Sequence, residues 1–188
     1  MIDSLCDQTG REDIAVIGLY CDFLAQREQS STDMLGAILK QLICRGKIPE
    51  HIREAFRKAK KEFGGRGPRL PDLVELMKKA IVSLPLVFIC IDAIDESIPR
   101  HRRELLESLR EIIRVSINTR IFLTGRPHIE DEIVKGFSKV VRIHFSPTQD
   151  DIKSYLEMRL SRDTDPYAMD DELRTDIMRV IPERISEV

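Results

Sequence analysis

The chain has 188 residues, and its 30 Lys and Arg nearly balance its 32 Asp and Glu, which gives a formal net charge of -2. This length suits one domain of ordinary size, or one domain and the start of a second, and it allows a substantial core. The charge balance gives no indication of nucleic-acid binding. No apolar run approaches the ~18 residues of a membrane span, and the start, MIDSLCDQTGRED, lacks the pattern of a signal peptide.

The four cysteines indicate a reducing, cytoplasmic location. Cys6, Cys21, Cys44 and Cys90 are far apart and form no C-x-x-C pair. Cys21 and Cys90 stand inside apolar runs, where a cysteine usually serves as a small hydrophobic residue. We therefore expect a cytoplasmic protein with neither a membrane nor a nucleic acid among its partners.

The first third of the chain predicts a strand followed by three helices. Residues 14–23, IAVIGLYCDF, are rich in β-branched and aromatic residues and are expected to form a buried strand. Apolar residues then recur at helical spacing over 33–44, 52–63 and 73–81. Ser31 or Thr32 can cap the first of these helices, and Pro71 suits the first turn of the third.

The rest of the chain continues the alternation. Strands are predicted at 86–91, 120–124 and 139–145, with a helix over about 100–116 between the first two. The segment PRHRRE at 99–104 is expected to be a solvated surface. A further helix follows SPTQDD, with Thr148 as its cap, and a last one begins near Met169. The prediction is an α/β fold with a mostly parallel sheet.

Three carboxylates follow the strand at 86–91, in LPLVFICIDAIDES. In an open parallel sheet, ligands bind outside the carboxyl ends of the strands. Asp92 there can hold a hydrated Mg²⁺, and Asp95 or Glu96 can orient or deprotonate a water for attack on a phosphoryl group. Acids after a strand also serve simply as turn or helix-start residues, but three together favour a site.

A second strand end adds an arginine. LTGRP places Arg126 at the same edge of the sheet, where a guanidinium can contact a γ-phosphate. Alone, this arginine would more often be a surface residue before a proline turn. The combination with the acids strengthens the prediction of a phosphoryl-transfer site.

These segments together resemble a known family. FICIDAIDE, RIFLTGRP and the earlier GLYCDFLAQREQSSTDMLGAILKQLI are similar to the NACHT-type P-loop domain of STAND signalling NTPases, in the nephrocystin-like form found in large fungal proteins. The resemblance implies that Asp92 binds Mg²⁺, that Asp95 and Glu96 position or activate the hydrolytic water, and that Arg126 senses the γ-phosphate of ATP or GTP. Gly125 replaces a residue that is usually serine there.

The phosphate-binding motif of that family does not occur in the sequence. G-x-x-x-x-G-K-[ST] cradles the triphosphate with backbone N–H groups and a lysine. The single Gly-Lys pair, Gly46-Lys47, has Gln41 and Ile48 at the flanking motif positions. By the resemblance, the motif would precede residue 1.

The resemblance also implies a sheet order of 5-1-4-3-2, an α/β domain over 1–146 and the start of a small helical domain over 147–188. Residues 14–23, 86–91, 120–124 and 140–144 would be strands 2, 3, 4 and 5 of a three-layer P-loop fold that lacks strand 1. Strand 1 would lie between strands 5 and 4, so its loss would expose strand edges and invite self-association. We predict marginal stability, which a cooperative melt at high temperature from a monodisperse monomer would contradict.

Three functions remain open. The chain is read first as a fragment of a nucleotide-dependent signalling switch that depends on Mg²⁺ and ATP or GTP, works with flanking effector and repeat domains, and lacks hydrolytic competence on its own. The alternative is a non-catalytic protein-interaction or structural module that keeps the NTPase-like fold. A third reading is an unrelated metal-dependent phosphohydrolase that uses the same acids.

Overall fold

The computed structural model describes residues 14–44, 48–62, 64, 67–137, 139–162 and 170–185. Cys6, Gly46, Lys47, Phe63 and Met169, which enter the sequence predictions, lie outside these ranges. The described chain forms two compact units, Met1–Val140 and Val141–Val188, and each is considered by itself.

The first unit is built on a parallel sheet of three strands, β1 (Ile14–Tyr20), β2 (Leu86–Asp92) and β3 (Thr119–Leu123), in the order β1-β2-β3. Gly18 pairs with Cys90 and Cys90 with Phe122, so the three strands run in register. The predicted α/β class is confirmed, and the neighbour order agrees with strands 2, 3 and 4 of the expected scheme.

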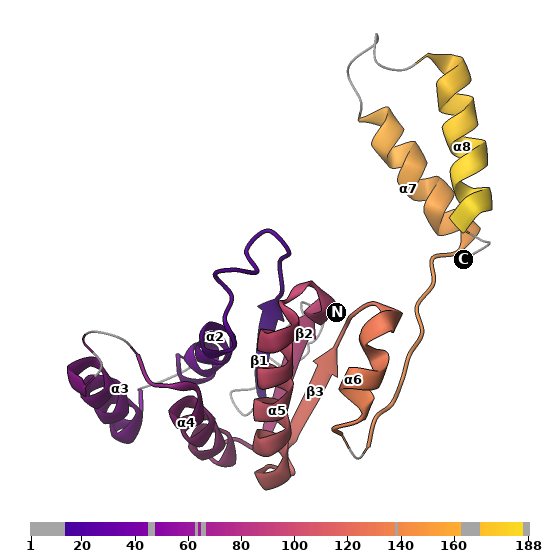
Figure 1. The fold of residues 1–188 in the computed structure, drawn as a ribbon. Helices are drawn as coiled ribbons and strands as arrows, with labels where there is room; N and C mark the ends of the chain where they lie inside the picture. The colour runs from indigo at the N-terminus through magenta and orange to yellow at the C-terminus, as the bar shows by residue number, and fades with distance from the viewer. Residues whose placement is uncertain are drawn as a thin grey trace. The chain divides into compact units, whose positions relative to one another are not determined.

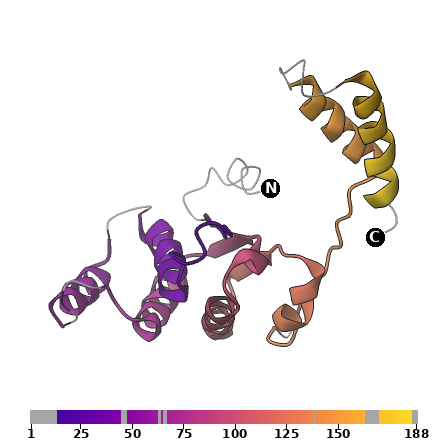
Figure 2. The same ribbon diagram turned by 45° about the horizontal axis from the view of Figure 1, so that its top comes forward.

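The described helices of the first unit include the four that the sequence predicted between the strands and three short ones after β2 or β3 that it did not predict (Figure 1). They are α2 (Ser31–Ile43), α3 (Glu50–Glu62), α4 (Leu70–Val82), the short η1 (Ile94–Glu96), α5 (Pro99–Val115), η2 (Pro127–Ile129) and α6 (Glu130–Val134). Helices α2, α4 and α5 pack on one another, and α2 also packs on β1. Figure 2 shows these three helices on the same side of the sheet.

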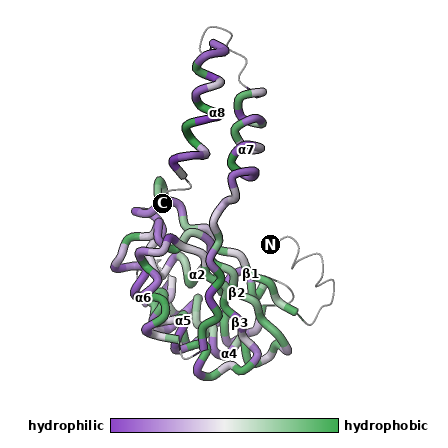
Figure 3. Tube along the Cα trace, turned by 90° about the vertical axis from the view of Figure 1, so that its right-hand side faces the viewer, coloured by the Kyte–Doolittle hydropathy of each residue, from purple (hydrophilic) through white to green (hydrophobic). Residues whose placement is uncertain are grey.

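The core lies between this helix layer and one face of the sheet. Alternate residues of each strand point into it, because successive side chains of a strand face opposite ways. The contributions from β1 and β2 are Ala15, Ile17, Leu19, Val87, Ile89 and Ile91, all buried. In Figure 3 the hydrophobic colour gathers along these strands. Helix α3 is attached more loosely, since only Ile52 and Ala59 on it are buried.

Helix α2 begins at Ser31, two residues before the predicted range of 33–44. Its cap is Ser30, not Ser31 or Thr32, because Ser30 and Asp33 form a reciprocal capping box. The Ser31 hydroxyl instead donates to Glu104 Oε2 of α5 at 2.5 Å. Ser30 is therefore the cap of α2 because Asp33, three positions later, completes the capping box.

The prediction of a strand at 139–145 is wrong. The described residues between α6 and Thr148 form neither helix nor strand. Val141, Ile143 and Phe145 are 89%, 67% and 94% exposed, so the alternating apolar pattern has neither a neighbouring strand nor a core to bury it. β-branched residues favour strands only where such a packed surface is present.

The second unit contains α7 (Gln149–Ser161) and α8 (Asp171–Ile185). These two helices contact each other, and Thr148 caps α7 as predicted. The sequence-based domain boundary between residues 146 and 147 stays a prediction. Over the described residues, no helix has the length and apolar character needed to cross a membrane.

Candidate functional site

The four predicted site residues lie at the carboxyl ends of β2 and β3. Asp92 is the last residue of β2, Asp95 and Glu96 are in η1 directly after it, and Arg126 follows β3. Because β2 and β3 are parallel neighbours, their ends meet at one edge of the sheet. The structure therefore brings together the residues that the sequence predicted for one site.

A tight turn separates Asp92 from the other two acids. Ala93 has φ 52, in the left-handed region that a non-glycine residue adopts at a cost of about 1–2 kcal/mol. Its N–H donates to Thr124 Oγ1 at 2.8 Å, and the N–H of Ile94 donates to the Thr124 carbonyl at 3.0 Å. These bonds to the end of β3 hold the turn, and the buried Ile94 anchors it to the core.

Asp92 is held by Thr124, whose hydroxyl donates to Asp92 Oδ1. The Asp92 carboxylate is half-buried, and Oδ2 has no hydrogen-bond or ion-pair partner among the described residues. One oxygen is thus committed to the protein and the other is available to a ligand.

Asp95 faces Arg126. Its Oδ1 accepts from the backbone N–H of Arg126 at 3.3 Å, and its Oδ2 lies 3.4 Å from Nε of the same residue. The Asp95 side chain is only 6% exposed, whereas that of Arg126 is 74% exposed. Asp95 therefore fixes the loop that carries Arg126, and the guanidinium extends toward solvent.

Gly125 allows this close approach. A Cβ at this position would lie 2.8 Å from Ile129 Cδ1 and 3.4 Å from Asp95 Oδ1. The first distance requires the Ile129 side chain to move. Glycine at this site therefore lets the Arg126 loop pack directly against Asp95 and Ile129.

Glu96 faces the other way, toward the end of β1. Its Oε2 accepts from the backbone N–H of Phe23 at 3.0 Å, and no partner of Oε1 is found among the described residues. The segment that follows β1 is also tied to β2, because the Cys21 N–H donates to the Asp92 carbonyl at 3.0 Å. The three acids thus share an edge but face three different segments.

This divergence explains a negative finding. Nowhere in the described ranges do three or more His, Cys, Asp or Glu side chains converge as a metal-binding group. A Mg²⁺ ion does not need such a group, because it keeps several waters and binds through one or two carboxylates plus substrate phosphates.

The pKa of Cys21 is affected by the nearby carboxylates. Burial, and then the charges of Glu96, Asp92 and Asp95, raise the pKa of the Cys21 thiol to about 11. A thiol of this kind stays protonated near neutral pH, so Cys21 is a buried packing residue and no nucleophile.

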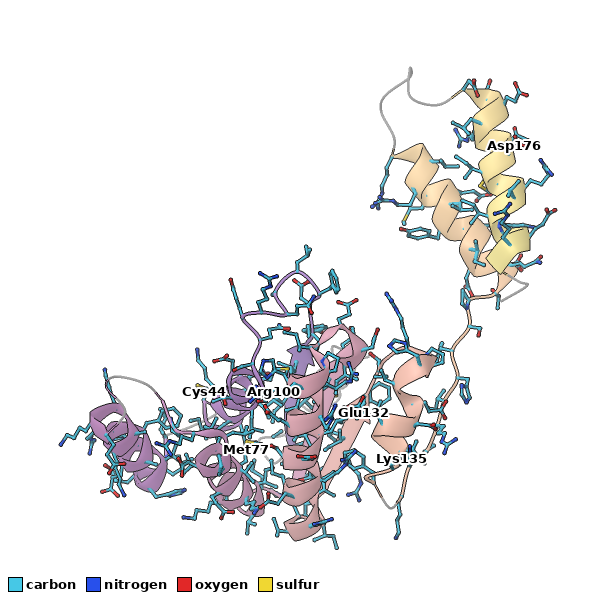
Figure 4. The ribbon with its side chains drawn as sticks, viewed as in Figure 1. Cys44, Met77, Arg100, Glu132, Lys135 and Asp176 are labelled. Atoms are coloured by element: carbon cyan, nitrogen blue, oxygen red, sulfur yellow. The ribbon has the colours of Figure 1, made fainter. Side chains whose placement is uncertain are left out.

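Arg102 is a residue of the site region that the sequence reading missed. The segment PRHRRE was expected to be solvated, but Arg102 is 7% exposed. Its Nη1 donates to the Ser97 carbonyl at 3.1 Å and to the Asp95 carbonyl at 3.4 Å, and its Nη2 lies 3.0 Å from Glu132 Oε2. Figure 4 shows Glu132 on the side of α6 that faces α5. Arg102 therefore stabilises the turn that carries Asp95 and Glu96.

Helical periodicity contains the signal that would have identified Arg102. Leu105, Leu106 and Leu109 are fully buried on α5, and position 102 lies three, four and seven residues before them, on the same helix face. Thr124 was missed as well, and its one signal is its place between a strand and the predicted Arg126.

A separate cleft between α2, α3 and the start of α4 contains none of the predicted site residues.

Comparison with known proteins identifies the family of the chain. A family model described as "Nephrocystin 3, N-terminal" matches residues 1–126, a range that ends at Arg126 and includes all four predicted site residues. No curated protein and no solved structure matched the chain. Since the model covers two thirds of the sequence, the chain belongs to the nephrocystin 3 N-terminal family.

Proposed function

We propose that the chain provides the magnesium-facing and γ-phosphate-facing part of a nucleotide-dependent signalling switch of the STAND class, a cytoplasmic protein with ATP or GTP as its ligand. The observation that carries the proposal is the meeting of Asp92, Glu96 and Arg126 at one edge of a parallel sheet. Carboxylates and an exposed guanidinium at such an edge suit a metal-bound phosphate.

Asp92 is the residue that would hold Mg²⁺. Its unpartnered Oδ2 matches the single carboxylate oxygen that a largely hydrated Mg²⁺ takes from a protein. When bound, the ion would neutralise charge on the phosphates of the nucleotide. The fixed orientation of the carboxylate would favour one position for the ion.

The other acids fit different tasks. Asp95 has both oxygens directed at Arg126 and is nearly inaccessible, so its contacts support a role in presenting Arg126. Glu96 is half-buried and keeps Oε1 without a partner in the described part of the chain, which supports it as the group that orients a water. Arg126, exposed and anchored through Nε, would contact the γ-phosphate with its terminal nitrogens.

The chain on its own is proposed to lack hydrolytic competence. The 188 residues contain no G-x-x-x-x-G-K-[ST] motif, and without that cradle most phosphate contacts are missing. Flanking effector and repeat domains would supply the stimulus and the response. β1 and β3 form the edges of the described sheet, which supports self-association as a further property.

The second candidate is a non-catalytic interaction or structural module. It is favoured by the degree to which the acids already bond to the protein, above all Asp95. Such a module would keep these contacts for the stability of the sheet edge and would bind no nucleotide in any context.

Titration calorimetry with Mg²⁺-ATPγS separates these functions. The experiment compares the 188-residue chain with the same chain extended before residue 1 by a strand and a G-x-x-x-x-G-K-[ST] motif, each as the native sequence and as Asp92→Asn. We expect no binding by the short chain and binding by the long one that Asp92→Asn weakens by at least about 10-fold. Binding by the short chain would contradict its proposed incompetence, and no binding by a P-loop-containing form would favour the non-catalytic module. Metal-dependent phosphate release by the short chain, lost in Asp92→Asn, would instead indicate the phosphohydrolase.

A further inference from the structure

Thr124 connects the end of β3 to the acid-bearing turn with both its side chain and its backbone. The Thr124 N–H donates to the Ile91 carbonyl at 3.0 Å, and the Thr124 carbonyl accepts from the Ile94 N–H at 3.0 Å. The hydroxyl bonds to Asp92 Oδ1 and to the Ala93 N–H. Four hydrogen bonds therefore join one threonine to the segment from Ile91 to Ile94.

The donors and acceptors in this group fix the direction of each bond. A backbone N–H only donates, so the Thr124 oxygen must accept from Ala93. The hydroxyl has one proton, and an ionised carboxylate only accepts, so that proton is directed at Asp92 Oδ1. The Asp92 side chain is held at Oδ1, and Oδ2 is the oxygen that remains for a ligand.

We propose that Thr124 is the positioning residue for Asp92. Its hydroxyl selects the rotamer of the Asp92 side chain and determines that Oδ2, and not Oδ1, is presented at the edge of the sheet. The same oxygen holds the Ala93 N–H in the left-handed turn that brings Asp95 and Glu96 into place. The inference deepens the proposed function, because it assumes that Asp92 is the magnesium ligand.

The chain provides matched variants for a test. Thr124→Val keeps the size and branching of the side chain and removes the hydroxyl, and Thr124→Ser keeps the hydroxyl. Thr119→Val is the control for stability: Thr119 begins β3, the strand that Thr124 follows, is 4% exposed, and bonds through its hydroxyl to Ser116 Oγ at 2.7 Å. Each valine variant removes one hydrogen-bonded hydroxyl, buried at Thr119 and half-buried at Thr124, from β3 or the residue directly after it.

The first measurement is the set of NMR three-bond couplings that report χ1 of Asp92 in the 188-residue chain. We expect couplings of a single staggered rotamer in the native chain, in Thr124→Ser and in Thr119→Val, and averaged couplings in Thr124→Val. We expect the midpoint of thermal unfolding to fall in both valine variants. If Thr124 only stabilised the fold, the Asp92 couplings of the two variants would therefore be alike. A single rotamer of Asp92 in Thr124→Val would overturn the inference.

The second measurement uses Mn²⁺ as a probe for the Mg²⁺ site. We expect paramagnetic broadening of the amide signals around Asp92 and Arg126, abolished by Asp92→Asn and requiring about 10-fold more Mn²⁺ in Thr124→Val but not in Thr124→Ser. No broadening in the native chain would count against the magnesium assignment of the proposed function, and the couplings of Asp92 would still decide the role of Thr124. Broadening that is unchanged in Thr124→Val would overturn the inference even if the site binds metal.

Discussion

Helices α2 and α7 have equal length and the same kind of start, yet very different surroundings. Each has 13 residues and a capping box, made by Ser30 with Asp33 in α2 and by Thr148 with Asp151 in α7. Helix α2 buries six residues against the sheet and its neighbouring helices, whereas α7 buries only Ile152. The capping signal determines where a helix begins, and tertiary burial determines how firmly it is held.

This contrast extends to the two compact units. The buried Ala, Val, Ile, Leu, Met and Cys side chains of the described residues lie in the first unit, except for Ile152 in the second. Figure 3 shows polar and apolar colours alternating along α7 and α8. We therefore expect the first unit to be stable against local opening and α7 to open readily, which the following experiments test.

The largest expected effect concerns the reactivity of Cys21. With a pKa of about 11 in place of 9.0, its thiolate fraction near pH 8 is about 100-fold lower than normal, and burial slows labelling further. Cys44 is exposed at the end of α2, as Figure 4 shows. Iodoacetamide labelling followed by mass spectrometry should modify Cys44 well before Cys21. Equal rates would mean that the first unit opens as readily as we expect of α7.

Next in size is the cost of removing one buried isoleucine from each helix. Ile38 of α2 is 0% exposed and Ile152 of α7 is 7% exposed. Ile38→Ala should lower the free energy of unfolding of the first unit by about 3 kcal/mol because it leaves a cavity in a closely packed core.

Hydrogen exchange of the amides of β1, β2 and β3 measures this effect residue by residue. Ile152→Ala should leave exchange in these strands unchanged and speed it in α7 alone. If the two substitutions accelerated exchange of the strands equally, the two units would not be energetically separate.

A smaller effect is expected from the ion pairs. Arg102→Ala should cost about 2 kcal/mol, because it leaves the partly exposed Glu132 without its partner and the Ser97 carbonyl without a donor. Arg179→Ala, which removes the exposed pair with Asp176 of α8 (Figure 4), should have no measurable effect. Urea unfolding provides the comparison, with Arg102→Met combined with Glu132→Gln as the control that removes both charges. A double variant that is no more stable than Arg102→Ala would contradict the explanation by an uncompensated charge.

The sequence predicted the fold well wherever a segment packs on its own unit. The spacing of apolar residues located β1, β2, β3 and every helix of the helix layer to within two or three residues. The segment at 139–145 failed because its pattern of Val141, Ile143 and Phe145 is that of a strand, and a strand also requires a neighbour, which a local pattern does not provide.

The site could be predicted only in part. The location of Asp92, Asp95, Glu96 and Arg126 at one edge of the sheet was predictable because charged residues directly after apolar strands are visible in the sequence. Their different orientations were not predictable, since these depend on partners 31 to 73 positions away, such as Arg126 for Asp95 and Phe23 for Glu96. The contacts of Thr124 with Asp92 and Ala93, 32 and 31 positions away, were missed for the same reason. Arg102 was missed although the periodicity of α5 places it on the buried face of that helix.

The smallest expected effect is at the start of α7, where the cap acts with little help from burial. The Thr148 hydroxyl and its backbone N–H both donate to the Asp151 carboxylate and hold the pKa of Asp151 below its ordinary 3.8. A lowered pKa means that this contribution to stability is present above the ordinary value and is lost as the pH falls through the lowered one. Thr148→Ala should therefore move the pKa of Asp151 upward and make α7 less sensitive to acid, whereas Thr148→Ser should change neither. Carbon-13 NMR titration of the Asp151 carboxyl measures the shift. An unchanged pKa of Asp151 in Thr148→Ala would show that the capping box does not form in solution. Helix α7 would then have neither the cap nor the buried core contacts that α2 has.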